Sequence, residues 1–135
     1  MSDTSHCGAL QNWPWPDSLD ALEAAPAHHE CLLENERVRV IHTHIPPGSV
    51  VPLHTHRWSG VAYVLSTGAF IRRDADGNVL FDSRQGSAPP VVPTVQWLDP
   101  LPPHTVENLG PSPISIIIVE LKGSAVGSRV GLEKR

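Results

Sequence analysis

Proline is the residue that most restricts the fold of this chain. Fourteen of its 135 residues are proline, and ten more are glycine. Proline lacks the backbone N–H that helices and central strands use, so both elements tolerate it poorly. So many prolines in a chain of this length favour short elements joined by frequent turns. We therefore expect an all-β architecture with little helix.

From residue 36 onward, strand patterns follow one another at short intervals. The turn at 74–78 contains Gly77, which can adopt the positive φ that a hairpin turn needs. Residues 114–119 are apolar at nearly every position and are expected to be buried on both faces. Eight or so short strands at regular spacing are typical of a sandwich or a jelly roll.

Other segments flank this barrel on both sides. Residues 1–35 are expected to form a tryptophan-containing arm and one short helix, which Asp17 or Ser18 can cap and Pro26 ends. Residues 36–122 would form the barrel, and residues 123–135 a flexible C-terminal tail. The sequence shows neither an internal repeat nor a second domain.

Charge and composition exclude several classes of partner. The formal net charge is -4 and the pI is about 6.0. No basic stretch is present, so we expect neither nucleic acid nor an anionic membrane as a partner. The longest apolar run, 116–119, is far too short to cross a bilayer, and the N-terminus lacks a secretory pattern. Cys7 and Cys31 make no disulfide framework, so a cytoplasmic protein with free thiols is expected.

The tripeptide His-Thr-His occurs twice, at 42–44 and at 54–56. Residues i and i+2 of a strand point to the same face, roughly 6.6 Å apart. Two imidazoles placed in this way can converge on one metal ion with bonds of about 2.1 Å. This geometry holds for both copies and does not choose between them. On neighbouring strands the two pairs would lie at different heights, so we do not expect all four histidines to share one ion.

The residues around the second copy resemble the first sequence motif of the cupin family. That motif consists of Gly, five residues, His-x-His, three or four residues, Glu, six residues and Gly. Its counterparts here are Gly48, His54, His56 and Gly68. The second cupin motif ends in His, three residues and Asn, and the segment from His104 to Asn108 resembles this ending.

The resemblance spans about residues 36–121, which is most of the chain. It implies a double-stranded β-helix, the jelly-roll barrel of cupins. It also implies that His54, His56 and His104 bind a divalent metal inside the barrel. By the same resemblance, His42 and His44 of the first copy are not ligands.

The glutamate of the first cupin motif is missing from this sequence. Its place falls on Gly60, or on Val61 when counted back from Gly68, and neither can bind metal. Gly60 shares the strand parity of His54 and His56, so we expect it to face inward and to leave space where a carboxylate would have reached the ion. A site of three histidines carries no ligand charge and leaves coordination positions open, which favours an anionic chelating substrate.

Four residues are expected to line the substrate pocket: Trp58, Gly60, Arg72 and Gln96. Trp58 has the parity of His56. Either Arg72 or Arg73 would face inward, where an arginine is suited to binding a carboxylate. Either Gln96 or Trp97 would also face the cavity, because neighbouring residues of a strand point to opposite faces.

Three other polar sites are not expected to bind the metal. The segment from His28 to Glu30 lies near the end of the short helix, where histidines are usually solvated or interact with the helix dipole. Glu107 lies three residues from His104 and would point to the other face of the strand. Nothing in the sequence places Glu120 near the metal.

The function that the resemblance implies is that of a three-histidine Fe(II) dioxygenase. Cupins of this kind act on β-diketones, hydroxyacetophenones or thiols, so a small chelating molecule is the expected substrate. Imidazole ligands suit several metals, so Zn, Ni or Mn remain open. A non-redox metal-dependent isomerase or lyase, and a non-catalytic binding protein, also remain open. The tryptophan-containing arm and the apolar last strand would give a homodimer a surface to bury.

Overall fold

Strands dominate the computed structural model, which describes residues 13–86 and 91–123. Its helical part is limited to a 3-10 turn, η1 (Asp17–Leu19), and to α2 (Ala21–Ala24). The described residues form nine strands, which are β1 (His29–Glu34), β2 (Val38–Ile45), β3 (Val50–His54), β4 (Gly60–Ser66), β5 (Phe70–Asp74), β6 (Val79–Asp82), β7 (Thr94–Leu98), β8 (His104–Asn108) and β9 (Ile114–Leu121).

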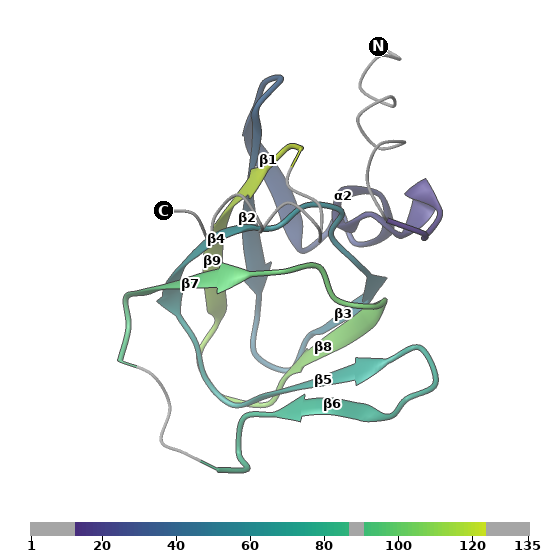
Figure 1. The fold of residues 1–135 in the computed structure, drawn as a ribbon. Coiled ribbons are helices and arrows are strands. Elements are labelled where there is room, and N and C mark those ends of the chain that lie inside the picture. Colours follow the sequence, from purple (N-terminus) through teal and green to yellow (C-terminus); the bar gives the residue numbers. More distant parts are fainter. Residues whose placement is uncertain (1–12, 87–90, 124–135) are drawn as a thin grey trace.

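The strands form two antiparallel sheets that face each other (Figure 1). One sheet has the order β1-β2-β9-β4-β7, and the other has the order β3-β8-β5-β6. Strands that are neighbours in space are therefore often distant in sequence, as in a jelly roll. The expected all-β jelly-roll architecture is confirmed. Among the described residues, no helix is both long enough and apolar enough to span a membrane.

Alternation along β2 shows how each strand contributes to the interior. Arg39, Ile41, Thr43 and Ile45 are buried, whereas the residues between them are partly or fully exposed. This period of two is that of a strand with one face on the core. Ile45 joins Val51, Ile114 and Ala25 in the apolar cluster between the sheets.

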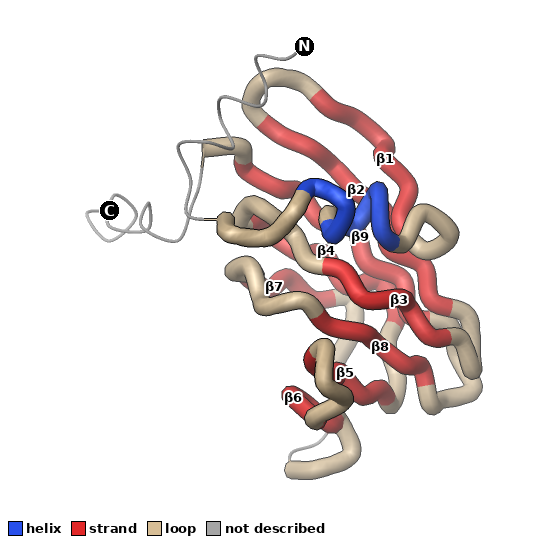
Figure 2. Tube along the Cα trace, turned by 90° about the vertical axis from the view of Figure 1, so that its right-hand side faces the viewer, coloured by secondary structure: helices blue, strands red, loops and turns tan. Residues whose placement is uncertain are grey.

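The first strand begins earlier than the sequence indicates. β1 starts at His29, within the segment expected to be arm and helix, and pairs antiparallel with β2. The helix is correspondingly shorter, and Asp20 caps α2 through the backbone N–H of Leu22 at 3.3 Å. Both helical turns lie against the outside of the barrel (Figure 2), where α2 contacts β1 and β3.

Some expectations fall partly or wholly outside the described residues. The tail is one of them, because residues 124–135 are not described, and Cys7 of the arm is another. Cys31 is a free thiol and is exposed on β1. β9 is the central strand of its sheet, but of its apolar residues only the inward Ile114 and Ile118 are buried, while the outward Ile117 is partly exposed. Burial on both faces is therefore only partial.

Candidate metal centre

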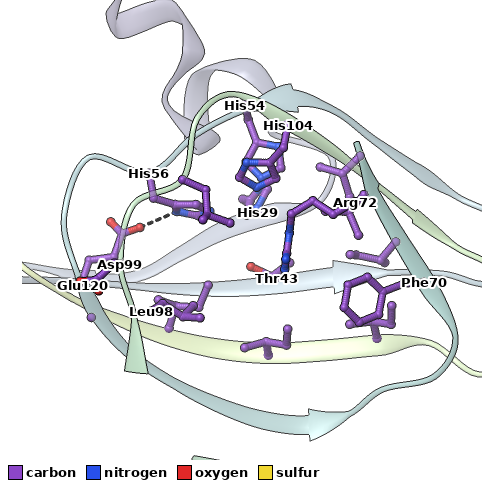
Figure 3. A pocket seen from close by; sticks show the side chains of 18 of the residues that line it. His29, Thr43, His54, His56, Phe70, Arg72, Leu98, Asp99, His104 and Glu120 are labelled. Atoms are coloured by element: carbon purple, nitrogen blue, oxygen red, sulfur yellow. Dashed lines mark hydrogen bonds and ion pairs between the residues drawn. The ribbon is translucent and has the colours of Figure 1, made fainter. Parts of the chain in front are cut away.

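A cavity of about 140 Å³ lies between the two sheets (Figure 3). Four histidines, His29, His54, His56 and His104, line it together with Glu120. The remaining wall is mainly apolar and includes members of the core cluster. The space therefore suits a small molecule with an apolar part.

The second His-Thr-His tripeptide reaches this cavity because β3 contains one extra residue. Val51 pairs with Val106 of β8 and His54 pairs with His104, so three steps along β3 match two along β8. A bulge of this kind reverses the face to which later residues point. Val51 lines the cavity, and in a regular strand Leu53 would follow it inward. With the bulge, His54 takes that place opposite His104.

Three of the histidines form a compact group. His29, His54 and His56 each offer a ring nitrogen, and these nitrogens all lie within 4.8 Å of one another. His104 lies beside this group, with its ring centroid 4.6 Å from that of His54 and the two ring planes tilted by 55°. The structure thus brings together the three histidines expected from the sequence and adds His29, which was not expected to take part. His29 pairs with Thr43, and this register turns its ring inward.

Each of the four imidazoles is held through its Nδ1 atom. Backbone carbonyl oxygens accept from His54, His29 and His104, with Nδ1–O distances of 2.8 Å to Pro52, 3.0 Å to Ala25 and 2.8 Å to Pro102. The Glu120 carboxylate accepts from His56 at 2.7 Å. Carbonyl and carboxylate oxygens only accept, so Nδ1 carries the proton in all four rings. Nε2 is then left as a lone-pair donor to a metal, which is the arrangement that second partners impose at metal sites.

Burial keeps the rings of His29, His54 and His104 neutral at ordinary pH. Desolvation, with repulsion from His56 and its neighbours, lowers the pKa of His54 to about 2. Desolvation also lowers the pKa values of His29 and His104 to about 4 each. A neutral imidazole is the form that binds a metal ion, so no proton has to leave these rings before binding at neutral pH.

Glu120 is the residue that sequence reasoning placed least well. It is fully buried on β9 and lines the cavity. One of its carboxylate oxygens holds His56, and the other accepts from Arg39 Nε at 2.8 Å. Arg39 in turn binds both carboxylate oxygens of Asp20, at 2.8 and 3.0 Å. Figure 3 shows Glu120 beside His56, on the side of the cavity opposite Arg72.

Gly60 faces inward, but it does not open space beside the histidines as expected; it allows two strands to approach each other closely. It pairs with Glu120, and a Cβ atom built on it would lie 2.2 Å from the carbonyl oxygen of Val119. The close approach of β4 to β9 therefore requires glycine here. The position leaves no space in which a glutamate side chain would reach the ion, so that expectation is corrected. The carboxylate beside the histidines comes instead from Glu120.

The other pocket residues expected from the sequence have separate outcomes. Trp58 is buried and lines the cavity. Arg72 also lines it, whereas Arg73 forms an ion pair with Glu107 at 2.9 Å. Gln96 shares the face of its partner Ala62 but is exposed and does not line the cavity, so this expectation is corrected. Leu98 and Asp99 contribute from β7 and the residue after it.

The two histidines of the first tripeptide lie outside the cavity. His42 is half-buried and its Nε2 atom lies 2.8 Å from the Ser115 hydroxyl, while His44 is exposed. Only the middle residue, Thr43, lines the cavity.

The donor set fits a divalent transition metal. Neutral imidazole nitrogens suit Zn, Fe, Ni and Cu, and three converging nitrogens are enough for a catalytic site with open positions. Within the described part of the chain, this three-histidine group could hold such an ion.

Comparison with known proteins gives the fold its name. No protein-family model matches the sequence, and no curated protein does. Among solved structures, a cupin domain from Bordetella pertussis Tohama I superposes with a TM-score of 0.56 and 21% identity, over 70% of this chain and 91% of its own.

Two further solved structures are similar at lower scores. One is an uncharacterized conserved protein with a double-stranded β-helix domain from Klebsiella pneumoniae, with a TM-score of 0.49, 21% identity and coverage of 72% of this chain and 77% of its own. The other is an RmlC-like cupin family protein from Methanocaldococcus jannaschii, with a TM-score of 0.47, 15% identity and coverage of 70% and 79%. The Bordetella similarity shows that this chain has the cupin fold that the sequence resemblance implied.

Proposed function

We propose that this protein is a metal-dependent dioxygenase that acts on a small chelating molecule, with Fe(II) as its metal. The observation that supports this is the set of inward histidines whose Nδ1 atoms are all engaged, which leaves Nε2 for an ion. His29, His54 and His56 would hold the ion, and His104 supplies a fourth imidazole beside them.

The charge of the site favours an anionic substrate. Histidine ligands are neutral, so they leave the two positive charges of a divalent ion uncompensated. Glu120 is not a direct ligand in this arrangement, because its oxygens are engaged by Arg39 and His56. A substrate that chelates through two oxygens or a thiolate would supply the missing negative charge.

The chain's own residues hold and enclose the reactants. When bound, ferrous iron supplies Lewis acidity toward the chelated substrate and electrons for its reaction with dioxygen. Both oxygen atoms enter the product of a dioxygenase, so no separate reductant is required. Leu98, Ile116 and Ile118 line the cavity with apolar surface that limits the access of water.

Acid–base chemistry has less support. The two carboxylates that line the cavity are engaged, because Glu120 holds His56 and Asp99 accepts from Ser59 and Trp97. A non-redox isomerase or lyase would need an effective general base next to the substrate. His104 is a weak base for this role, because burial lowers its pKa to about 4. We therefore favour the dioxygenase over the isomerase or lyase.

Elemental analysis followed by oxygen uptake tests the proposal. The protein is purified without a histidine tag, its metals are measured, and it is loaded with Fe(II) under anaerobic conditions. We expect about one ion per chain and oxygen uptake that depends on an added diketone or thiol, with neither in His54→Ala. Bound zinc or nickel with no oxygen uptake after iron loading would instead favour the non-redox alternative, and no metal at all would favour a binding protein.

The expected homodimer stays a prediction. β9 lies in the centre of its sheet, so the exposed apolar residues of that sheet are on neighbouring strands. Tyr63, Leu65, Val95 and Trp97 are each 39–63% exposed. Sedimentation at micromolar concentration should show a dimer, and a clean monomer would contradict it.

A further inference from the structure

Arg72 is a partly buried cation that forms no ion pair with a carboxylate among the described residues. Its side chain extends from β5 into the cavity (Figure 3), and its Nε atom is buried without a hydrogen-bond partner. The guanidinium carbon lies 5.6 Å and 5.8 Å from the ring centroids of Phe70 and Phe81. Within residues 13–86 and 91–123, no carboxylate forms an ion pair with it.

The neighbouring acidic groups are engaged elsewhere. Glu107, on the strand next to β5, pairs with Arg73. The two carboxylates that line the cavity, Glu120 and Asp99, accept from other residues. A cation withdrawn from water without an anion is costly, and burial lowers the pKa of Arg72 accordingly. A molecule bound in the cavity is in position to supply the negative charge that would balance it.

Two further groups in the same cavity lack partners. The Thr43 hydroxyl and the Trp58 indole N–H are both buried without a hydrogen bond. Together with Arg72, these residues give the cavity lining three polar groups without a hydrogen-bond partner among the described residues. Buried donors without acceptors are rare in native proteins. A molecule rich in acceptor oxygens would satisfy them.

We propose that Arg72 binds a carboxylate group of the substrate, with Thr43 as a second donor, so that the substrate is a short metal-binding carboxylic acid. This inference rests on the proposed function, because the other end of the molecule would bind the ion. A guanidinium is suited to a planar carboxylate through two parallel N–H donors. The cavity of about 140 Å³ limits the connecting chain to a few carbons, which the apolar Val106 and Ile116 would contact.

The test uses the Co(II)-loaded protein and two probes that differ only in charge. 3-Mercaptopropionate and its neutral amide, 3-mercaptopropionamide, are titrated and followed by the absorption of the cobalt–thiolate bond. Wild type should bind the acid at least ~10-fold more tightly than the amide, because only the acid can form a charge-assisted pair with the guanidinium. Arg72→Gln should remove this preference and leave the affinity for the amide unchanged.

Arg73→Gln is the matched control. It removes the same charge from the next residue, which pairs with Glu107 outside the cavity, and it should leave both affinities unchanged. Near-ultraviolet circular dichroism verifies that each variant is folded. Equal binding of acid and amide by wild type, or an equal loss of both in Arg72→Gln, would overturn the proposal.

An experiment without metal distinguishes failure of this proposal from failure of the proposed function. Propionate and propionamide are titrated into metal-free protein and followed by the chemical shifts of backbone amides. If cobalt does not bind, the proposed function fails, yet propionate binding that is lost in Arg72→Gln would still support the carboxylate site. Propionate binding that is indifferent to Arg72, or absent from wild type, would overturn the site in this experiment.

Discussion

The two His-Thr-His tripeptides place the same three side chains in opposite directions. In residues 42–44, on the regular strand β2, the threonine faces the cavity and the histidines face outward. In residues 54–56 both histidines face the cavity, because the bulge in β3 reverses the strand parity just before them. Composition is identical, so the difference teaches that one extra backbone residue decides which copy can bind a metal.

The histidine partners on β9 extend the comparison. His42 lies against the neutral hydroxyl of Ser115, and it does so through Nε2. His56 lies against the Glu120 carboxylate and uses Nδ1. In His42, the Nε2 atom that would bind a metal is therefore engaged by a hydroxyl. In His56, a carboxylate orients the ring through Nδ1 and leaves Nε2 for the metal.

The largest expected difference is in metal affinity. His54→Ala and His56→Ala each remove one of three ligands, which should weaken binding by well over ~100-fold, since loss of an outer partner alone costs about 10–100-fold. His42→Ala and His44→Ala should retain wild-type affinity. Titration with Co(II) followed by absorption measures this, and equal losses in both tripeptides would break the comparison.

His29 extends the second tripeptide into a complete site. We expect His29→Ala to lose metal to the same extent as His54→Ala, because both lie in the compact group. His104→Ala should lose less, because its nitrogen lies outside that group. His28→Ala is the matched control, since this neighbouring ring contacts the Ser49 hydroxyl instead. If His104→Ala lost more metal than His29→Ala, the motif histidines alone would define the site.

Glu120 and Ser115, the β9 residues that contact His56 and His42, can be substituted one at a time. Glu120→Gln keeps the shape but removes the charge that orients His56, and should weaken metal binding by about 10–100-fold. Ser115→Ala removes the equivalent partner of His42 and should leave metal binding unchanged. Thermal unfolding is measured alongside, because Glu120→Gln also leaves the buried Arg39 with Asp20 alone. Unchanged affinity in Glu120→Gln would mean that His56 needs no such partner.

Acid should destabilise the metal-free protein through the buried rings of His29, His54 and His104. Their pKa values lie below the ordinary 6.5, at about 2 for His54 and about 4 for His29. The unfolded chain therefore takes up protons below pH 6.5 that the folded state excludes, so stability is complete above that pH and is lost as the pH falls toward 4. Each such histidine lowers the free energy of unfolding by about 1.4 kcal/mol per pH unit.

Urea unfolding at pH 7, 6 and 5 tests this pH dependence. His54→Gln should reduce the slope, because it removes one of the excluded protons. A flat profile would show that the rings are not held neutral in the folded state.

The smallest effect concerns the middle threonines. Thr55 is fully buried and its hydroxyl donates to the Leu101 carbonyl, so Thr55→Val should cost about 1–3 kcal/mol by leaving that oxygen unpaired. The Thr43 hydroxyl has no partner, so Thr43→Val should change the stability of the ligand-free protein by less than ~0.5 kcal/mol. Urea unfolding of both variants at pH 7 compares them, and equal costs would contradict the difference.

Local pattern predicted the barrel and placed His54, His56 and His104 on its inner wall. It missed His29, because the inward turn of that ring depends on pairing with Thr43, which is distant in sequence. The inward position of Glu120 could have been predicted from the sequence, since it shares the strand parity of the buried Ile114 and Ile118. The reason for glycine at position 60 could not be predicted from local sequence, because the close approach of β4 to β9 involves two strands that are distant in the chain.

The contacts from Asp20 through Arg39 and Glu120 to His56 join the N-terminal segment to the histidine group in series. The same segment is tied to the tripeptide by backbone hydrogen bonds, from Thr55 to Leu19 at 2.7 Å and from Ala21 to Thr55 at 3.0 Å. Coupling of this kind is reciprocal. Metal binding that orders His56 therefore also stabilises the contact of the N-terminal segment with the barrel. Detachment of the segment would lower the metal affinity by the same factor by which the metal favours attachment.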